Sequence, residues 1–252
     1  MVKNNHSCDN RSKLDSLLRS DVADRDPAVL ESVLAYARSL AKFENALVVV
    51  SDMAAGRSHI IAGGFARNLD IGDYSREESI WERRILSLMS PEEQERKYIA
   101  ELRFFHFLRH LPPRKRPDYF LMSKLRFRFT DGRIHGVLHR MFYVFDETID
   151  AVRYAVCIYG PLSLELSGES FACDSVTGSM EGMSVITRDM ILSPRERQVL
   201  ALIDTGLKSA EIADRLHISP HTVSRHRQQI IARLQVKNTH EACRVAKSLH
   251  LF

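Results

Sequence analysis

The 252-residue sequence has few cysteines and no long apolar run. Its four cysteines, Cys8, Cys157, Cys173 and Cys243, lie too far apart in the chain for a zinc knuckle or a redox pair. We interpret them as reduced thiols, because they form no disulfide framework. No apolar run approaches the roughly 18 residues of a membrane helix, and the amino terminus MVKNNHSCDN lacks the apolar core of a signal peptide. We therefore expect a soluble, cytoplasmic protein without membrane contact.

Acidic residues are absent from residues 219–234, near the end of the chain. The formal net charge is only +4, but it is unevenly distributed. Residues 191–252 contain ten Lys and Arg against five Asp and Glu, whereas residues 1–190 contain 26 against 27. The whole basic excess therefore lies in the last quarter of the chain, where a polyanion such as double-stranded DNA would bind.

No set of residues in the sequence is typical of a catalytic site. Gly63-Gly64 is interpreted as a turn, because no Gly-x-Gly-x-x-Gly motif precedes a helix. His106 and His110 have the spacing of a zinc pair, but no Glu follows His106 and no third ligand is evident. We interpret them as surface histidines at a helix end, with axial haem ligation in a sensor domain as the alternative. The sequence thus predicts no enzyme, no catalytic residues, no metal site and no cofactor, haem or another small ligand in a sensor domain excepted.

Residues 27–43 are expected to form an amphipathic helix. Apolar side chains recur at helical spacing on one of its faces: Leu30, Val33, Leu34, Ala37, Leu40 and Ala41. Such a face must pack against its own domain or against a second copy of itself. Residues 1–26 are expected to be an amino-terminal extension, and the polar residues 1–10 to fray.

The middle of the chain changes from helical to alternating patterns. In order, it predicts strands at 48–50 and 59–61, helices from Ser75 and from Ser90 to about His110, three strands within 119–159, and a hairpin within 171–186. Ser75-x-x-Glu78 and Ser90-Pro91 are typical helix starts. The strands are inferred from alternating apolar and charged side chains and from the turn at Asp131-Gly132.

This order of two strands, helices and a three-stranded meander resembles a PAS-type sensor domain. The resemblance rests on topology and implies an α+β fold, a single antiparallel sheet with helices on one face, with its core at 44–162. It also implies that helix 27–43 is a flank of the kind that often dimerises such domains. Charges at Lys124, Arg126 and Arg128 predict a sheet covered on one side only. With the loop at residues 114–116 they are also candidates for binding an anionic ligand or DNA, although a solvated face is the favoured interpretation.

The last sixty residues carry closely spaced helix-boundary signals. Ser193-Pro194-Arg195-Glu196 is a capping box, and Gly206 is placed to end the first helix. A short helix at 209–216 is followed, after about three residues, by a helix that Ser219-Pro220 caps. A last helix starts at Asn238 or Thr239. Four short helices in this order predict an all-α bundle with a helix-turn-helix motif at about residues 209–228.

The helix after Ser219 has two different faces. Val223, Ile230 and Leu234 form an apolar stripe, with Arg227 or His226 between them. The opposite face carries hydroxyl, amide and guanidinium groups, which are the groups that bind base edges in a DNA groove.

A set of residues at fixed spacing now indicates a family. They are residues 192–196, Gly206-Leu207, Glu211-Ile212-Ala213, Leu216, Ile218-Ser219, Thr222-Val223, His226, Ile230, Leu234 and Val236. This segment resembles the LuxR-type (GerE-like) DNA-binding domain over roughly a quarter of the chain. One residue departs from the pattern: the family usually has Ser or Thr at the position of Lys208, so either Ser209 caps the second helix or Lys208 contacts a phosphate.

The resemblance implies a role for each matching surface residue. Base-contacting positions are Ser224, Arg225 and Gln228, where Arg would favour guanine and Gln adenine. Positions near the DNA backbone are Lys208, Thr222, Arg233, Lys237 and Thr239, which would set register and salt-sensitive affinity. His226 is interpreted as a packed, hydrogen-bonded residue at the helix junction.

The expected domain order is an extension (1–26), a flanking helix (27–43), a PAS-like domain (44–186), a linker (187–191) and the DNA-binding domain (192–252). A phosphorylated receiver domain is disfavoured, because the meander at 119–159 contradicts a parallel sheet. We predict a homodimeric transcription regulator whose front domain senses a small ligand or sets dimer geometry. RNA polymerase is a further candidate partner. The alternative is constitutive DNA binding, with a front domain that only binds protein.

Overall fold

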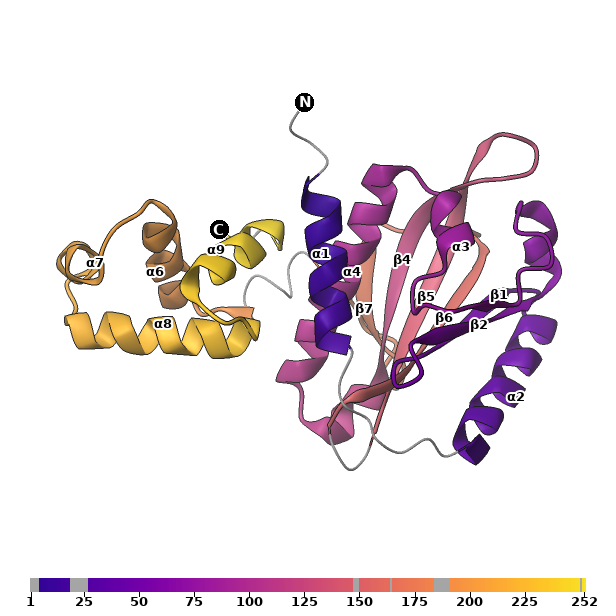
Figure 1. Ribbon diagram of the computed structural model, residues 1–252, viewed down its shortest axis with the longest axis horizontal. Coiled ribbons are helices and arrows are strands. Elements are labelled where there is room, and N and C mark those ends of the chain that lie inside the picture. Colours follow the sequence, from indigo (N-terminus) through magenta and orange to yellow (C-terminus); the bar gives the residue numbers. More distant parts are fainter. Residues whose placement is uncertain (1–4, 19–26, 147–149, 164, 184–190, 250) are drawn as a thin grey trace. The chain divides into compact units, whose positions relative to one another are not determined.

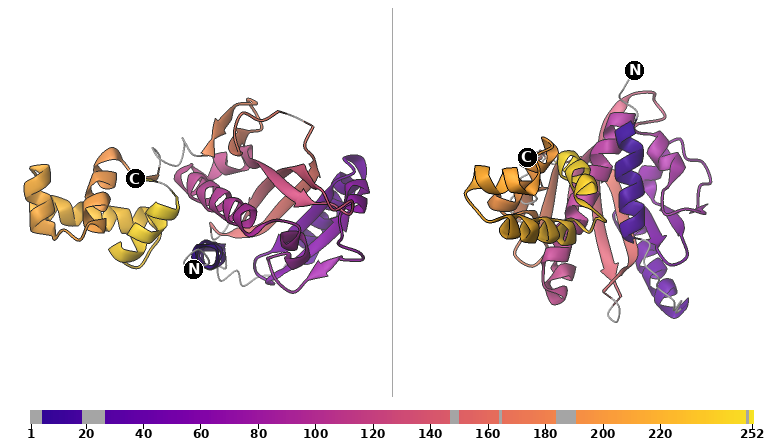
Figure 2. Two further views of the ribbon diagram at one scale, coloured as in Figure 1. Left: turned by 90° about the horizontal axis from the view of Figure 1, so that it is seen from above. Right: turned by 60° about the vertical axis from the view of Figure 1, so that its left-hand side comes forward.

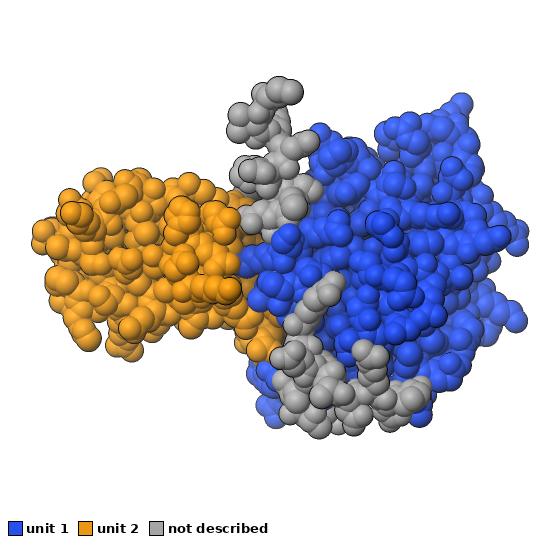
Figure 3. Space-filling view, in the orientation of Figure 1, with its two compact units in different colours: residues 1–101, 112–182 blue, residues 102–111, 183–252 orange. Residues whose placement is uncertain are grey.

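The computed structural model describes residues 5–18, 27–146, 150–163, 165–183, 191–249 and 251–252. The chain divides into two compact units (Figure 3). The amino-terminal unit comprises Met1–Glu101 and Pro112–Gly182, and the carboxy-terminal unit comprises Leu102–Leu111 and Met183–Phe252. The linker predicted at residues 187–191 lies outside the described residues except for Ile191. Within the described ranges, no helix is both long and apolar enough to cross a membrane.

The amino-terminal unit is built on an eight-stranded antiparallel sheet (Figure 1). Its strands are β1 (Leu47–Asp52), β2 (Arg57–Ala62), β3 (Arg76–Glu77), β4 (Tyr119–Arg128), β5 (Ile134–Phe145), β6 (Val152–Pro161), β7 (Ser170–Asp174) and β8 (Met180–Gly182). The spatial order is β3-β2-β1-β6-β5-β4-β7-β8. Strand β6 therefore returns from the meander to pair with β1, which places the meander and the first strand pair in one sheet.

Helical segments flank this sheet. They are α1 (Asn5–Leu18), α2 (Pro27–Phe43), the 3-10 turn η1 (Gly64–Asn68), α3 (Arg83–Ser87), α4 (Pro91–His110) and the 3-10 turn η2 (Pro113–Asp118). Helix α4 begins as the sequence predicts, since the Ser90 hydroxyl accepts the Glu93 N–H at 3.2 Å.

Two local predictions are wrong. Residues 5–10, expected to fray, belong to α1, which is anchored because Leu14 and Leu18 are buried. The helix expected from Ser75 starts only at Arg83. Residues 76–77 instead form β3 against Ser58 and His59, and this strand pairing replaces the capping box.

The two faces of the sheet are covered differently (Figure 2). Helix α2 packs Ala37 and Ala41 against the outer face, where Val48, Val50 and Val156 lie. The alternate residues of the same strands, such as Val49 and Cys157, are buried on the inner face. Helix α2 therefore covers the outer face at β1 and β6, whereas Arg126 and Arg128 of β4, two of the charges on which the prediction of an uncovered side rested, stay exposed.

Among the described residues from Pro194 to Leu249, four helices follow one another in the predicted order. They are α6 (Pro194–Asp204), α7 (Ser209–Leu216), α8 (Pro220–Leu234) and α9 (Thr239–Ser248). The capping box forms as expected, with the Ser193 N–H donating to the Glu196 carboxylate at 2.7 Å. Gly206, with a φ of 89°, follows the end of α6 in the left-handed region. The antiparallel sheet with helices and the separate helical domain confirm the predicted fold class.

Candidate DNA-binding site

Helix α8 presents one buried and one exposed face. Val223, Ile230 and Leu234 have no exposed surface, because they pack into the core of the helical unit. Ser224, Arg225 and Gln228 are exposed on the other side of the helix. Figure 1 shows α8 at the edge of this unit, with α6 and α9 on one side of it. The three residues predicted to contact bases therefore share a surface that remains open to a partner.

The orientation of α8 relative to α7 is set by the turn between the two helices. Ser219 caps the helix, since its hydroxyl accepts the Thr222 N–H at 3.0 Å. His217 ends α7 in the left-handed region, with a φ of 52°. The Ile218 N–H donates back to the Ala213 carbonyl at 3.0 Å. These bonds hold α7 and α8 together as the predicted helix-turn-helix.

The sequence leaves open whether Arg227 or His226 lies between the apolar residues on the inward side of α8. In the structure, Arg227 makes the inward contacts. Its guanidinium donates to the Ser209 hydroxyl at 2.9 Å and to the Thr239 hydroxyl at 3.1 Å. One side chain of α8 thus joins the first residue of α7 to the first residue of α9. The sequence pattern does not predict this structural role, although an arginine on the apolar side of an amphipathic helix is a signal for it.

His226 is half-buried, as expected of a packed residue. Its Nδ1 has no hydrogen-bond partner among the described residues, so the expected bond is absent at this nitrogen.

The structure also shows which residue caps the start of α7. Lys208 itself is the capping residue of α7, and its backbone N–H donates to the Glu211 carboxylate at 2.7 Å. Ser209 is the first helical residue and accepts from Arg227 instead.

The predicted backbone-contacting residues fall into two groups. Lys208 and Lys237 are exposed at the starts of α7 and α9. Arg233 lies 3.2 Å from the buried Glu196 carboxylate, Thr222 shares a hydrogen bond with Ser219 at 2.8 Å, and Thr239 accepts from Arg227. Arg233, Thr222 and Thr239 therefore also stabilise the helical unit. They can bind a DNA phosphate only with the hydrogen-bond donors that these internal contacts leave over.

Comparison with known proteins matches this part of the chain to one family. Residues 190–246 match the model described as bacterial regulatory proteins, luxR family. The carboxy-terminal domain is a LuxR-type helix-turn-helix domain. The transcriptional regulatory protein FixJ of Rhizobium meliloti (strain 1021) is 44% identical over 55 residues, which cover 22% of this chain and 27% of FixJ. The match thus spans about a quarter of that relative.

Some solved structures are similar over a longer span. A phage VqmA–DPO complex has 14% identity, a TM-score of 0.34 and 88% coverage of both chains. The Vibrio cholerae VqmA dimer has 16% identity, a TM-score of 0.29 and the same coverage. Escherichia coli SdiA has 14% identity and a TM-score of 0.26, with 96% of this chain and 98% of SdiA covered. Similarity at this level assigns no ligand to this chain.

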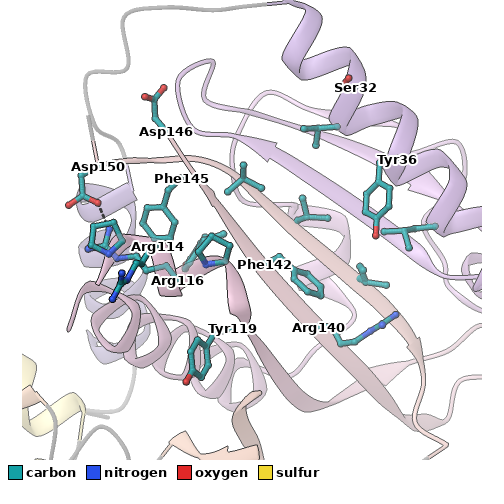
Figure 4. Close-up of a pocket in the computed structure, with 18 of the residues that line it drawn as sticks. Ser32, Tyr36, Arg114, Arg116, Tyr119, Arg140, Phe142, Phe145, Asp146 and Asp150 are labelled. Atoms are coloured by element: carbon teal, nitrogen blue, oxygen red, sulfur yellow. Dashed lines mark hydrogen bonds and ion pairs between the residues drawn. The ribbon is translucent and has the colours of Figure 1, made fainter. Parts of the chain in front are cut away.

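A groove of about 960 Å³ lies on the outer face of the sheet, in the unit that precedes the LuxR-type domain (Figure 4). Val33, Tyr36 and Leu40 of α2 line one side of it, and Phe142 of β5 lies on its floor. Two ion pairs lie at its margin: Arg140 binds Glu44, and Arg116 binds Asp150. The rest of its lining is mainly apolar, and Arg114 adds a further charged side chain.

Three side chains of the basic segments that were candidates for binding an anion or DNA are engaged within the unit. Arg116 is buried, and its guanidinium lies 5.1 Å from the centre of the Phe145 ring. Lys115 pairs with Asp118 at 3.2 Å, and Arg126 donates to the buried Glu93 at 2.9 Å. These contacts support a structural use of the charges.

The inner face of the sheet carries a buried polar cluster. Lys97 and Glu101, one turn apart on α4, form an ion pair. Ser51 donates to the Glu82 carboxylate at 3.2 Å, and burial raises the pKa of Glu82. A void of about 20 Å³, close to the size of one water molecule, adjoins these groups.

The two histidines that were considered as haem ligands are not part of this polar cluster. His106 and His110 belong to the end of α4 that is counted with the carboxy-terminal unit. His106 is buried, so its expected place on the surface is wrong. A ring N–H of His110 donates to the His106 carbonyl at 2.7 Å. Haem ligation by this pair stays a prediction.

Proposed function

We propose that this protein is a sequence-specific, double-stranded-DNA-binding transcription regulator. The observation that carries the proposal is the exposed face of α8. Ser224, Arg225 and Gln228 are exposed there, while the opposite face of the same helix is buried. A rigid helix with one polar, non-acidic face fits the width of the DNA major groove.

Arg225 and Gln228 each have a matching base. The Arg225 guanidinium can donate two hydrogen bonds to the O6 and N7 atoms of guanine, and the Gln228 amide can pair with the N6 and N7 atoms of adenine. Ser224 tolerates either purine. Lys208 and Lys237 would bind phosphates and add affinity without base preference. The specificity of the domain would therefore depend on three adjacent side chains.

Affinity would require two copies of the chain. One helix-turn-helix contacts only a few base pairs, so two domains on half-sites about one helical turn apart are needed. Helix α2 supports a role in dimer formation, because Tyr36, which lines the groove, is 65% exposed, and Phe43, the last residue of the helix, is 80% exposed. Sedimentation of Tyr36→Ser should show a weaker dimer than the wild-type protein. Arg38→Ser, on the same helix, is the matched control, and equal weakening by both variants contradicts a specific interface.

The amino-terminal unit would control the spacing of the two DNA-binding domains. A ligand that binds one arrangement more tightly shifts the population toward it. RNA polymerase is the expected final target of such regulation. The alternative is constitutive DNA binding, in which the amino-terminal unit only binds protein. A small molecule retained through purification, or one that changes DNA affinity, separates the two versions, since the alternative predicts neither.

Selection of duplexes from a random pool by the full chain tests the proposal. We expect enrichment of a motif with two related half-sites about one helical turn apart. The affinity for this motif should fall steeply as salt rises, because bound phosphates release counterions. Recovery of unselected sequences at low salt contradicts sequence-specific binding.

A further inference from the structure

The inner face of the amino-terminal sheet is unusually polar for a domain core. Five of its buried side chains could bind a ligand or a metal: Ser51, Ser58, Ser123, His139 and Cys157. Antiparallel pairing sets their positions. Ser123 is opposite His139 on β4 and β5, and Met141, two residues after His139, is opposite Cys157 on β6. Period-two alternation then places His139 and Cys157 on one face, diagonally adjacent.

Helix α4 adds a carboxylate to this pair. One oxygen of Glu101, one ring nitrogen of His139 and the Cys157 sulfur all lie within 4.8 Å of one another. The three residues are 3%, 0% and 5% exposed, respectively. They come from three separate elements, α4, β5 and β6, that the fold brings together. Three different metal-binding groups thus converge in the buried interior of the unit.

His139 provides an independent observation. Neither of its ring nitrogens has a hydrogen-bond partner among the described residues, although the side chain is fully buried. The ring is held in place by stacking on Tyr159, with 4.8 Å between centroids and 17° between planes. Buried polar atoms without a partner are rare, and they commonly indicate a water or an ion. The free imidazole therefore points to an occupant of the cluster.

We propose that Glu101, His139 and Cys157 form a site for a divalent transition-metal ion of the zinc type. Thiolate, imidazole and carboxylate together are typical zinc ligands, whereas Mg²⁺ and Ca²⁺ prefer oxygen alone. Three protein ligands leave the fourth tetrahedral position for water or a small molecule. The Cys157 thiol loses its proton to solvent as its sulfur binds the ion.

Lys97 is the group that a metal ion must displace. Its ammonium pairs with Glu101, and both residues line the same small void as Cys157 and Glu82. When Glu101 binds the ion, Glu82 is the other acidic side chain of that void toward which Lys97 can turn. The Cys157 thiolate and the Glu101 carboxylate then balance the two charges of the ion.

The sequence predicts no metal site, and the proposed site differs from that prediction. Glu101, His139 and Cys157 are separated by 38 and 18 positions in the chain, so no short ligand motif exists. The inference concerns the amino-terminal unit alone and does not depend on DNA binding. A protein that selects a DNA motif but binds no metal would contradict this inference and leave the proposed function intact.

Cobalt titration of the full, chelator-treated chain tests the site. We expect one Co²⁺ per chain, with a near-ultraviolet thiolate-to-cobalt charge-transfer band that Zn²⁺ abolishes by competition. The band should disappear in Cys157→Ser and in His139→Asn. It should persist in Cys173→Ser, which removes a buried thiol of the same sheet outside the cluster, and in His135→Asn. A band that survives in Cys157→Ser, or no band in the wild-type protein, overturns the proposal.

X-ray absorption of the zinc-loaded wild-type protein covers the case in which these variants fail to fold. The site predicts one sulfur at about 2.3 Å and nitrogen or oxygen ligands at about 2.0–2.2 Å. A shell of nitrogen and oxygen alone would show that the ion binds elsewhere and would overturn the proposal.

Discussion

The two units use their polar side chains in opposite ways. In the LuxR-type domain, Ser224, Arg225 and Gln228 are exposed on one side of a single helix. In the amino-terminal unit, Lys97 and Glu101 are buried against the inner face of the sheet. Exposed polar groups add little to stability and remain available to a partner. Buried ones must find partners inside, so changing them changes the fold as well as the site.

The largest effect is therefore expected inside the amino-terminal unit. Lys97→Ala leaves the buried Glu101 carboxylate without its ion-pair partner. We expect the unit to lose about 3–5 kcal/mol of unfolding free energy. Trp81, the single tryptophan of the chain, lies in this unit, so its fluorescence in urea with chelator present reports the change.

The double variant Lys97→Met with Glu101→Leu is the control for that prediction. Replacing both charges by apolar side chains of similar size should restore most of the lost stability. A loss of less than about 1 kcal/mol in Lys97→Ala alone would contradict the description of Lys97 and Glu101 as a buried ion pair.

The next largest effect is expected at Arg227. Arg227→Ala removes the hydrogen bonds that join α8 to Ser209 and Thr239. We expect a loss of about 2 kcal/mol, measured by native-state hydrogen exchange of the α8 amides. DNA affinity should fall equally for all sequences. Arg225→Ala, two residues away and exposed, should leave exchange unchanged, and a similar loss in both variants would contradict the assigned roles.

A smaller effect is expected at Lys237. Lys237→Ala should weaken binding to every duplex and lower the salt dependence of the affinity by about 0.9 on a double-logarithmic plot. Fluorescence anisotropy at several salt concentrations measures this slope. Lys124→Ala on β4 is the control and should leave the slope unchanged. A change of base preference in Lys237→Ala would show that the lysine contacts a base.

The smallest effect concerns Glu77, which accepts hydrogen bonds from Arg83 at 3.0 Å and from Tyr74 at 2.8 Å. The Arg83 hydrogen bond lowers the pKa of Glu77 below its ordinary value of 4.5. Its contribution to stability is therefore complete above pH 4.5 and disappears as the pH falls through the lowered pKa.

Glu77→Gln should accordingly lower the urea midpoint at pH 7 and have a much smaller effect at an acidic pH below the lowered pKa of Glu77. The expected cost at pH 7 is at most about 1 kcal/mol, because Arg83 is exposed. The exposed neighbour Glu78→Gln is the control. An effect of Glu77→Gln that is equal at both pH values would indicate lost packing in place of a lost charge.

The same contrast explains which features the sequence could predict. The LuxR-type domain is specified by local signals: caps at Ser193 and Ser219, the left-handed Gly206 and one helical stripe. The period of one helix predicts which of its faces is polar, and the resemblance to the LuxR-type family implies which residues of that face contact bases. The position of Arg227 could not be settled in this way, because its partners Ser209 and Thr239 lie 18 and 12 residues away.

The amino-terminal unit was predictable in its order of elements and not in its details. Alternation predicts the strands, and Ser90-Pro91 predicts α4. Helix α1 was missed, because it has only a weak apolar face and is stabilised by burying Leu14 and Leu18. The cluster of Glu101, His139 and Cys157 depends on strand register, which no local pattern encodes.

Base preference of Arg225 variants tests the central claim most directly. The wild-type protein, Arg225→Lys and Arg225→Ala each select duplexes from the same random pool. Arg225→Lys keeps the positive charge and Arg225→Ala removes it, so the three motifs separate the effect of the charge from that of the guanidinium hydrogen bonds. We predict that Arg225→Ala loses about 1–3 kcal/mol of preference at one base pair of each half-site, whereas Arg225→Lys keeps most of the salt dependence. An unchanged motif in Arg225→Ala would contradict the placement of this face of α8 in the major groove.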